Sequence, residues 1–408
     1  MQSSDCYYLS LEPYVHGIVR GDKVLLYNTL NKKHLIFNSN PEVAALINQL
    51  LQPSNGRVIE VPGEKLTLSP IKNLVQQLQR TFMGEVFHAG WSDIKPVNFI
   101  PLPVVKETPF TLEDNLHEIT IHLDSGPEPM LKSFQDAFYQ FTFPKINSAG
   151  RESIDTGMIE RLIDEVSSLP LLTINLVGSH VLSYPGLGRL LTLSQAKQFR
   201  KKIHIPLNLY ERGHLPLITS YTRLVFLVTF PVSSSEILKM RNIIQEIPRE
   251  KDREFIFIVQ DHDEVEQSEV LIGQLDLKSV YFKPFFNGHN NLFFETSVFM
   301  TETDIVSSKP SQRQILSRYM MNENDFGKIT ILPDGSIYSN VNEVALGSLK
   351  ESSVIELIKK ERNGGSSWKR IRMDQTPCSR CIYQFLCPPV SNYELFMKKF
   401  NLCHIEID

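Results

Sequence analysis

The sequence CSRCIYQFLCPPVSNYELFMKKFNLC, residues 378–403, holds four of the five cysteines of the chain. These four are Cys378, Cys381, Cys387 and Cys403, spaced C-x2-C-x5-C-x15-C. A C-x2-C pair can direct both sulfurs at one metal, and a third and a distant fourth thiolate complete a tetrahedral set. The spacing therefore predicts a metal site, holding either zinc or a four-iron cluster. Four reduced buried thiols or a disulfide pair are the alternative.

The composition is that of a soluble globular protein. The 408 residues are 42% hydrophobic and 22% charged, which suits two or three domains. A net charge of -4 gives no electrostatic reason to expect nucleic acid as a partner. The opening MQSSDCYYLSLEPYV lacks the pattern of a signal peptide, and no apolar run reaches the roughly 20 residues of a membrane span. We expect a cytoplasmic protein without a membrane partner, whose thiols stay reduced.

Residues 1–92 are expected to form a small, separate α+β domain. Asn40 and Pro41 are typical of a helix start, as N-cap and first helical residue. Alternating branched and aromatic residues predict strands, and apolar residues at helical spacing predict helices. The predicted elements are strands at 23–30, 32–38 and 57–61 and helices at 40–52 and 69–82. A proline-containing linker, 93–115, then marks a domain boundary.

Residues 116–310 alternate between apolar runs and amphipathic segments. Near-continuous apolar runs are typical of strands covered on both faces, so the alternation predicts a parallel sheet with helical crossovers. Six units are too few for a closed eight-stranded barrel and favour a partial (β/α)6 barrel. The six predicted strands are 117–124, 171–178, 202–210, 223–230, 254–260 and 279–286, and the clearest helices are 157–169, 233–247 and 264–275.

Residues 311–408 form the third predicted domain. KITILPDGSIYSN, 328–340, predicts a hairpin that turns at Asp334 and Gly335. A short helix is expected at 352–362, and the basic run WKRIR, 368–372, is interpreted as a solvated helix end rather than a nucleic-acid site.

This tail resembles the SPASM domain of radical S-adenosylmethionine (radical-SAM) enzymes that modify ribosomally made peptides. A full SPASM domain has seven cysteines for two auxiliary four-iron clusters. Here Ser391 and Asn340 stand where two of the first cluster's cysteines are expected, and another is absent. Cys378, Cys381 and the two later tail cysteines match the ligands of the second cluster. The resemblance therefore implies one iron–sulfur cluster, with zinc as the alternative.

The same family carries C-x3-C-x2-C after its first barrel strand, where three thiolates hold the radical-generating cluster. In this chain SGPEPMLKSFQDAFYQF, 125–141, contains no cysteine, and none occurs between Cys6 and Cys378. The family's Gly-Gly-Glu-Pro motif holds the amine of the cofactor's methionine. Its counterpart here is GSHVLSYPGL, 178–187, where only Gly178 remains and the carboxylate is missing. The chain thus looks like a pseudo-radical-SAM protein, and S-adenosylmethionine is not expected as a cofactor.

Three functional hypotheses follow. The first is a non-catalytic scaffold with no catalytic residues, which binds a precursor-peptide leader and a modifying enzyme, a ligase or a radical-SAM maturase. Related maturases carry an N-terminal winged-helix-like module that takes the leader as an added strand, which implies a groove along strands 23–37 and helix 43–50. The second is an electron-transfer partner, or an enzyme with a site near His180, Asn208 and Asp261. Capping of the next helix is the other explanation for Asp261. The third is a zinc-stabilised interaction protein.

Overall fold

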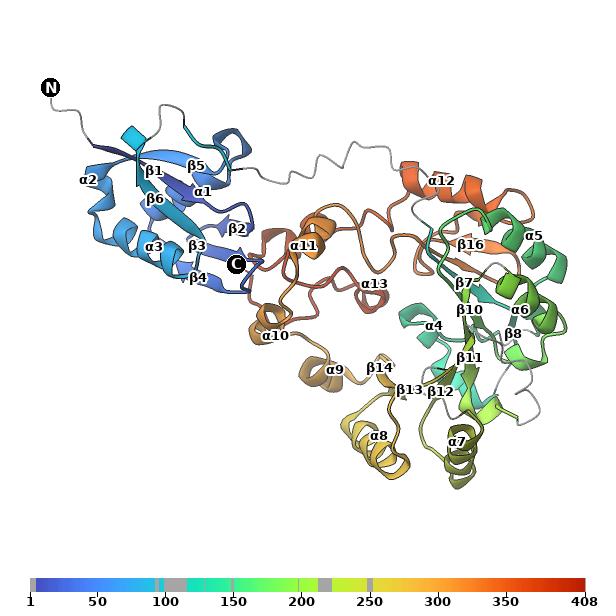
Figure 1. Cartoon of the computed structure of the whole chain (residues 1–408). Coiled ribbons are helices and arrows are strands. Elements are labelled where there is room, and N and C mark those ends of the chain that lie inside the picture. The colour runs from blue at the N-terminus through green and yellow to red at the C-terminus, as the bar shows by residue number, and fades with distance from the viewer. Residues whose placement is uncertain are drawn as a thin grey trace.

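The computed structural model describes residues 5–91, 95–98, 116–127, 129–147, 150–196, 198–211, 222–247 and 252–407. Figure 1 shows a small N-terminal part, a large sheet with helices on one side, and the C-terminal segment between them. The predicted linker at 93–115 lies outside the described residues, apart from 95–98. Within the described ranges, no helix has the length and apolarity needed to cross a membrane.

The N-terminal part contains two three-stranded antiparallel sheets around one apolar core. The first sheet has the order β2 (Val15–Arg20), β3 (Lys23–Asn28), β4 (His34–Asn38), and the second has the order β5 (Val58–Pro62), β1 (Cys6–Leu11), β6 (Gly84–His88). Three helices accompany the sheets: α1 (Pro41–Leu51), α2 (Gly63–Leu66) and α3 (Ser69–Arg80). Asn40 caps α1 through its side chain, 2.9 Å from the Val43 nitrogen, as predicted. Strands β1, β2 and β6 were not predicted.

The larger part is built on a nine-stranded sheet, and the predicted parallel sheet is confirmed. Six consecutive strands are parallel: β7 (Glu118–His122), β10 (Thr173–Val177), β11 (Arg200–Pro206), β12 (Thr222–Val228), β13 (Arg253–Val259) and β14 (Val280–Pro284). Each lies within, or shifted by at most two residues from, a predicted apolar run. The sheet continues on the other side of β7 with three further strands: β15 (Lys328–Ile331), β16 (Ser336–Tyr338) and β17 (Gly347–Ser348).

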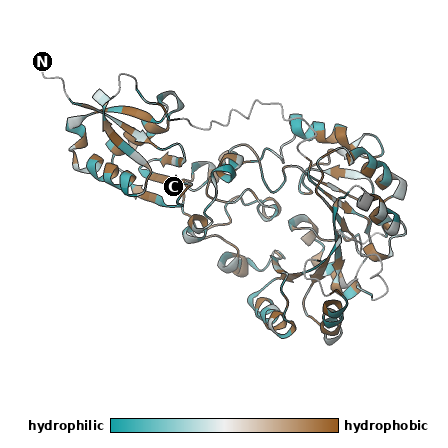
Figure 2. Cartoon of the chain, in the orientation of Figure 1, coloured by the Kyte–Doolittle hydropathy of each residue, from teal (hydrophilic) through white to brown (hydrophobic). Residues whose placement is uncertain are grey.

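Helices cover one face of this sheet, here called the outer face (Figure 1). They are α5 (Thr156–Val166), α6 (Leu187–Ala196), α7 (Ser234–Glu246) and α8 (His262–Leu275). Outer-face residues such as Ile119, Ile174 and Ile203 are buried in one cluster with apolar residues of these helices. Figure 2 shows hydrophobic strands and helices with both hydrophobic and hydrophilic stripes, as amphipathic packing requires. The opposite, inner face carries Thr120, Asn175 and neighbours.

The C-terminal segment, here called the tail, runs from residue 311 to the end of the chain. Its predicted hairpin forms β15 and β16, and β15 pairs in parallel with β7, so the tail extends the sheet. Its helices are α11 (Gln312–Arg318), α12 (Val354–Gly364) and α13 (Asn392–Met397), and α9 (Asn291–Ser297) and α10 (Glu302–Ser307) lead into it.

The N-terminal part packs against the tail through a shared apolar cluster. Ile18 and Leu25 of the β2–β3 hairpin are buried together with Ile315 and Phe385 of the tail. Tyr27 is fully buried in the same cluster, and its hydroxyl donates to the Pro310 carbonyl at 2.9 Å. Buried apolar contact combined with a satisfied hydroxyl is typical of a stable interface between parts of one chain.

Candidate functional site

The four tail cysteines are free thiols in loop-rich backbone around a short turn at Cys378–Arg380. Cys378 and Cys381 are each 6% exposed, and Cys387 and Cys403 are half-buried. The Cys378 sulfur donates to the Phe400 carbonyl at 3.0 Å, and the Tyr383 amide donates to the Cys381 sulfur at 3.4 Å. In the described ranges, no three His, Cys, Asp or Glu side chains stand close enough to hold a metal ion.

The thiols nevertheless lie near one another and share one electrostatic environment. Burial is the main reason that the pKa of Cys381 is raised to about 11 and that of Cys387 to about 12, and the neighbouring thiols contribute to both increases. Burial also raises the pKa of Cys378, whose sulfur lies 3.6 Å from Arg372 Nη1, a cation that opposes the rise. Four uncrosslinked thiols in a loop-rich tail fit a thiolate-bound metal in their chemistry, and ligation requires thiolates that have drawn together.

Apart from the exposed Lys369, the basic run at 368–372 is buried or half-buried in the tail, so its interpretation as a solvated helix end is wrong. Trp368 is 2% exposed and donates from its indole nitrogen to the Lys328 carbonyl at 3.2 Å. Arg372 pairs with Glu394 at 2.8 Å and donates to the Phe400 carbonyl at 3.2 Å. It therefore joins α13 to the loop beside Cys378. Partners 22 and 28 residues away explain why the sequence did not reveal this burial.

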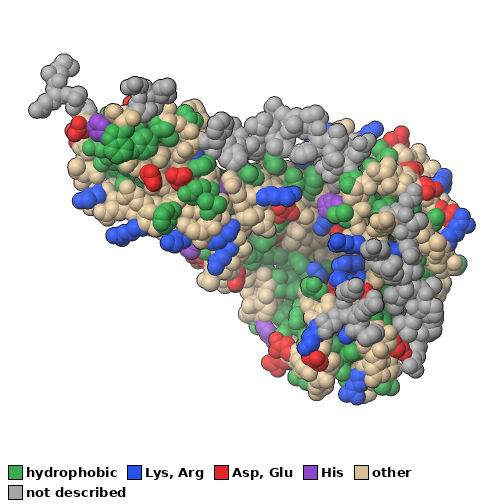
Figure 3. All heavy atoms as spheres, in the orientation of Figure 1, with side chains coloured by type: hydrophobic (Ala, Val, Ile, Leu, Met, Phe, Trp, Pro, Cys, Tyr) green, Lys and Arg blue, Asp and Glu red, His purple; other side chains and the backbone are tan. Residues whose placement is uncertain are grey.

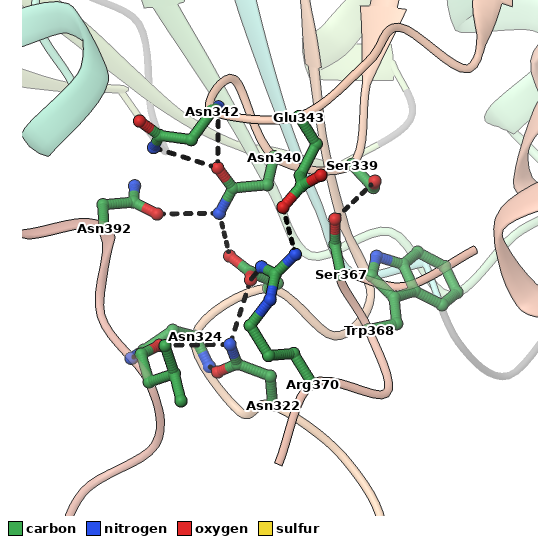
Figure 4. Close-up of polar contacts among 12 residues, drawn as sticks. Asn322, Asn324, Ser339, Asn340, Asn342, Glu343, Ser367, Trp368, Arg370 and Asn392 are labelled. Atoms are coloured by element: carbon green, nitrogen blue, oxygen red, sulfur yellow. Dashed lines mark hydrogen bonds and ion pairs between the residues drawn. The ribbon is translucent and has the colours of Figure 1, made fainter. Parts of the chain in front are cut away.

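A hydrogen-bonded network surrounds Asn340, one of the two residues at positions where the resemblance leads us to expect SPASM cysteines (Figure 4). Its side-chain nitrogen donates to Asp325 Oδ1 at 2.9 Å and to Asn392 Oδ1 at 2.7 Å. Its side-chain oxygen accepts from the Asn342 amide at 2.9 Å. Arg370 forms an ion pair with Asp325, with nitrogen and oxygen 3.8 Å apart. Polar partners thus satisfy the buried Asn340, as a buried amide requires.

Ser391, the second residue at an expected cysteine position, caps α13. Its hydroxyl accepts from the Glu394 amide, and the Glu394 carboxylate accepts from the Ser391 amide at 2.8 Å, which together form a capping box. The two positions where the pattern has thiol ligands therefore have local structural roles here.

The carboxyl ends of the parallel strands form what we call the mouth of the sheet. Asp124, just after β7, is fully buried there. Its Oδ1 accepts from the Ser179 amide at 2.8 Å and from the His180 amide at 3.2 Å. A side chain at Gly178 would bring a Cβ 2.9 Å from Asp124 Oδ2. This contact explains the glycine retained in GSHVLSYPGL, and sequence analysis did not identify Asp124.

An apolar cluster fills the inner face at the mouth. The segment that follows β7 contributes Leu131, Phe134 and Phe143, each at most 3% exposed, and the first two lie in the stretch 125–141. They pack against Leu227 and Ile258, near the carboxyl ends of β12 and β13, with Phe134 and Phe285 rings 5.2 Å apart. Hydrocarbon therefore occupies this part of the inner face.

The three residues predicted for a possible enzyme site, His180, Asn208 and Asp261, have local structural partners. Asp261 caps α8, with its Oδ1 2.8 Å from the Glu264 amide, as the capping interpretation predicts. The Asn208 carbonyl accepts from Lys239 Nζ at 2.7 Å. The His180 amide is bonded to Asp124. These contacts give each residue a role in holding its loop.

Comparisons with known proteins locate the fold. The sequence matches no protein-family model and no curated protein. Two crystal structures of Streptococcus suis SuiB, one bound to precursor peptide SuiA and one bound to S-adenosylmethionine, each match with a TM-score of 0.51 and 11% sequence identity. Both matches cover 97% of this chain and 100% of the SuiB chain. The chain therefore has a mixed α/β fold with a large parallel sheet, similar to that of SuiB over nearly its whole length.

Proposed function

We propose that this chain is a non-catalytic, radical-SAM-like scaffold that binds a precursor peptide during the maturation of a ribosomally synthesised, post-translationally modified peptide. The observation that carries the proposal is the filled mouth: Leu131, Phe134 and Phe143 occupy the inner face where a radical-generating cluster and its cofactor would need room. The sequence has no cysteine in that segment, so three thiolate ligands cannot form there.

The structural neighbours support the peptide-maturation part of the proposal. SuiB is the protein bound to precursor peptide SuiA in one of the two matching structures, and the match extends over 97% of this chain.

For the leader we propose the free edge of β4, the most exposed strand of its sheet. Helix α1 packs against β2, at the other edge, and its residues Val43 and Ile47 are buried in the core. The Asn28 amide donates to the Lys33 carbonyl, so the backbone of Lys33 faces β3. In an antiparallel pair, hydrogen-bonded and non-hydrogen-bonded residues alternate, and the backbone amide and carbonyl of the next residue, His34, therefore point away from β3. A leader strand can pair with such an edge.

The leader site can be tested with His34→Pro. Proline removes one outward amide and leaves the pairing with β3 intact. The matched control is His34→Ala, which removes the same side chain and keeps the amide. The probe is a synthetic leader of a precursor peptide encoded beside this chain's gene, measured by fluorescence anisotropy. We expect His34→Pro to weaken binding about tenfold. This factor corresponds to the upper end of the net free energy that one hydrogen bond contributes. Equal binding by both variants would exclude this edge.

For the tail we propose one iron–sulfur cluster held by Cys378, Cys381, Cys387 and Cys403. A cluster with four thiolate ligands stabilises loop-rich structure and has no open coordination position. The tail residues supply a cationic neighbour, Arg372, beside the Cys378 sulfur, which favours the thiolate form of that ligand.

The tail site can be tested by anaerobic purification followed by iron, sulfide and zinc analysis. Iron and sulfide in equal amounts, about four of each per chain, support the cluster, and one zinc without sulfide supports the zinc alternative. Cys378→Ala should lose the metal and make residues 330–408 sensitive to protease. Cys6→Ala, outside the tail, should change neither. Metal content unchanged in Cys378→Ala would contradict the ligand assignment.

A further inference from the structure

A large chamber lies between the inner face of the sheet and the tail, with a cavity volume of about 1390 Å³. Its lining includes Glu118, Thr173 and Arg200, the first residues of β7, β10 and β11. The chamber is therefore at the amino ends of the strands, opposite the mouth. Figure 3 shows a hollow in this face of the molecule with Lys and Arg side chains gathered at one side.

Among the described residues that line the chamber, cations outnumber acids, six to four. The six cationic residues are Arg200, Lys201, Lys202, Arg223, Lys283 and Lys328. The chain as a whole has a net charge of -4, so the excess of positive charge is a local feature of this chamber. Low-dielectric walls strengthen the attraction of such a hollow for an anion.

One buried carboxylate, Glu254, serves several of these cations. Its Oε2 lies 3.3 Å from Arg223 Nη1 and 3.7 Å from Lys202 Nζ. Lys283 is near enough to be influenced by Glu254, Lys202 and Lys328, and burial lowers its pKa. No ion pair is found for Lys283 or Lys328 among the residues that the structure describes. The positive charge is thus only partly neutralised by the described part of the chain.

His204 adds a second, independent observation. It is 5% exposed, lines the chamber, and has no hydrogen-bond partner for either ring nitrogen within the described structure. A buried polar group left unpaired is costly, so a ligand or water in the chamber would stabilise it. At neutral pH its ring is uncharged, because burial lowers its pKa to about 3. It can therefore offer one donor and one acceptor.

We propose that the chamber is a binding site for a multivalent anion, a ligand with at least two carboxylate or phosphate groups. Lys283 and Lys328 would contact the charged groups, and His204 would bond a neutral polar atom of the ligand. The source is either a small soluble anion or the acidic side chains of a peptide segment. The proposal stands apart from the leader site on β4 and from the tail metal, which involve other residues.

The experiment is calorimetric titration of the full chain with three probes: pyrophosphate, citrate and a hexaglutamate peptide. Lys283→Met and Lys328→Met each remove a cation and keep the apolar stem. Each should weaken the binding of every probe that binds by about tenfold or more, since a partly buried charge pair is worth at least that much. The matched control is Lys359→Met on α12, an exposed lysine outside the chamber, and it should change affinity less than twofold.

A variant that is expected to increase affinity distinguishes loss of the site from misfolding. Glu254→Gln removes the anion that competes for the chamber cations, so it should tighten binding. Hexaglutamate binding more tightly than the two small anions identifies a peptide as the source, and the reverse order identifies a small molecule. Absence of binding of all three probes to the unaltered chain at about 1 mM would overturn the proposal. So would equal weakening by Lys283→Met and Lys359→Met.

Discussion

Replacing Arg372 with methionine tests the structural basis of the tail most sharply. Arg372 Nη1 and Nη2 contact the two carboxylate oxygens of Glu394 at 2.8 and 3.2 Å. The guanidinium also donates to the carbonyls of Pro388, Pro389 and Phe400. One side chain thus joins α13, the loop after Cys387 and the segment that leads to Cys403.

The magnitude follows from what Arg372→Met leaves behind. The Glu394 side chain is 2% exposed and would lose its ion-pair partner while staying buried. Breaking one partner of a buried pair costs about 3–5 kcal/mol. Adding Glu394→Gln removes the stranded charge and keeps an acceptor for the capping box, so the double variant should recover most of that loss.

Hydrogen exchange of the amides in α13 is the suitable assay, because it reports local opening in a chain of several parts. We expect Arg372→Met to speed exchange there about 100-fold or more, and the double variant to exchange much more slowly than the single one. The control is Lys369→Met, an exposed lysine three residues away. If Arg372→Met and Lys369→Met exchange alike, the clamp described here is wrong.

Three further predictions concern other positions. Gly178→Ala should destabilise the chain by about 1–3 kcal/mol through the clash with Asp124, while Gly188→Ala, whose added Cβ meets nothing within 4 Å, should be neutral or stabilising; thermal denaturation decides. Burial lowers the pKa of His122 from 6.5 to about 3, so the unfolded chain binds the proton first and stability falls as pH drops below about 6.5. Between pH 6.5 and 5 this loss of stability amounts to about 2 kcal/mol. His122→Phe should therefore show a smaller fall in melting temperature over that range than the unaltered chain. Parallel curves for the two proteins would contradict the prediction. Ser391→Cys should leave the metal content unchanged and loosen α13 by about 1 kcal/mol through the lost cap, and a gain of iron would contradict the account of the replaced cluster.

The parallel sheet could be predicted from the sequence because its central strands, β12 and β13 above all, are buried at nearly every position. Runs such as RLVFLVTF at 223–230 then stay apolar at nearly every position, and β12 and β13 carry them almost residue for residue. Strands β1 and β6 lacked such a signal. Each is short, and β1 pairs with partners about 50 to 80 residues distant, so only the tertiary fold makes them strands.

The candidate sites were predictable only where the chemistry is local. Cysteine spacing indicated the tail thiols, and the sequence Asp261–Glu264 indicated a helix cap. Asp124 gave no signal, because its role depends on amides 55 and 56 residues further along. The cationic chamber was missed for the same reason: Lys202, Lys283 and Lys328 lie on three separate strands, and only the parallel register brings them to one face.

The scaffold account predicts that no S-adenosylmethionine is cleaved at the filled mouth. The direct measurement is 5′-deoxyadenosine release by the anaerobically reconstituted full chain with S-adenosylmethionine and dithionite. We predict release no greater than in a control without protein. Release of at least one 5′-deoxyadenosine per chain, in an activity that exposure to oxygen abolishes, would show that a radical-generating centre exists. That result would contradict the scaffold proposal.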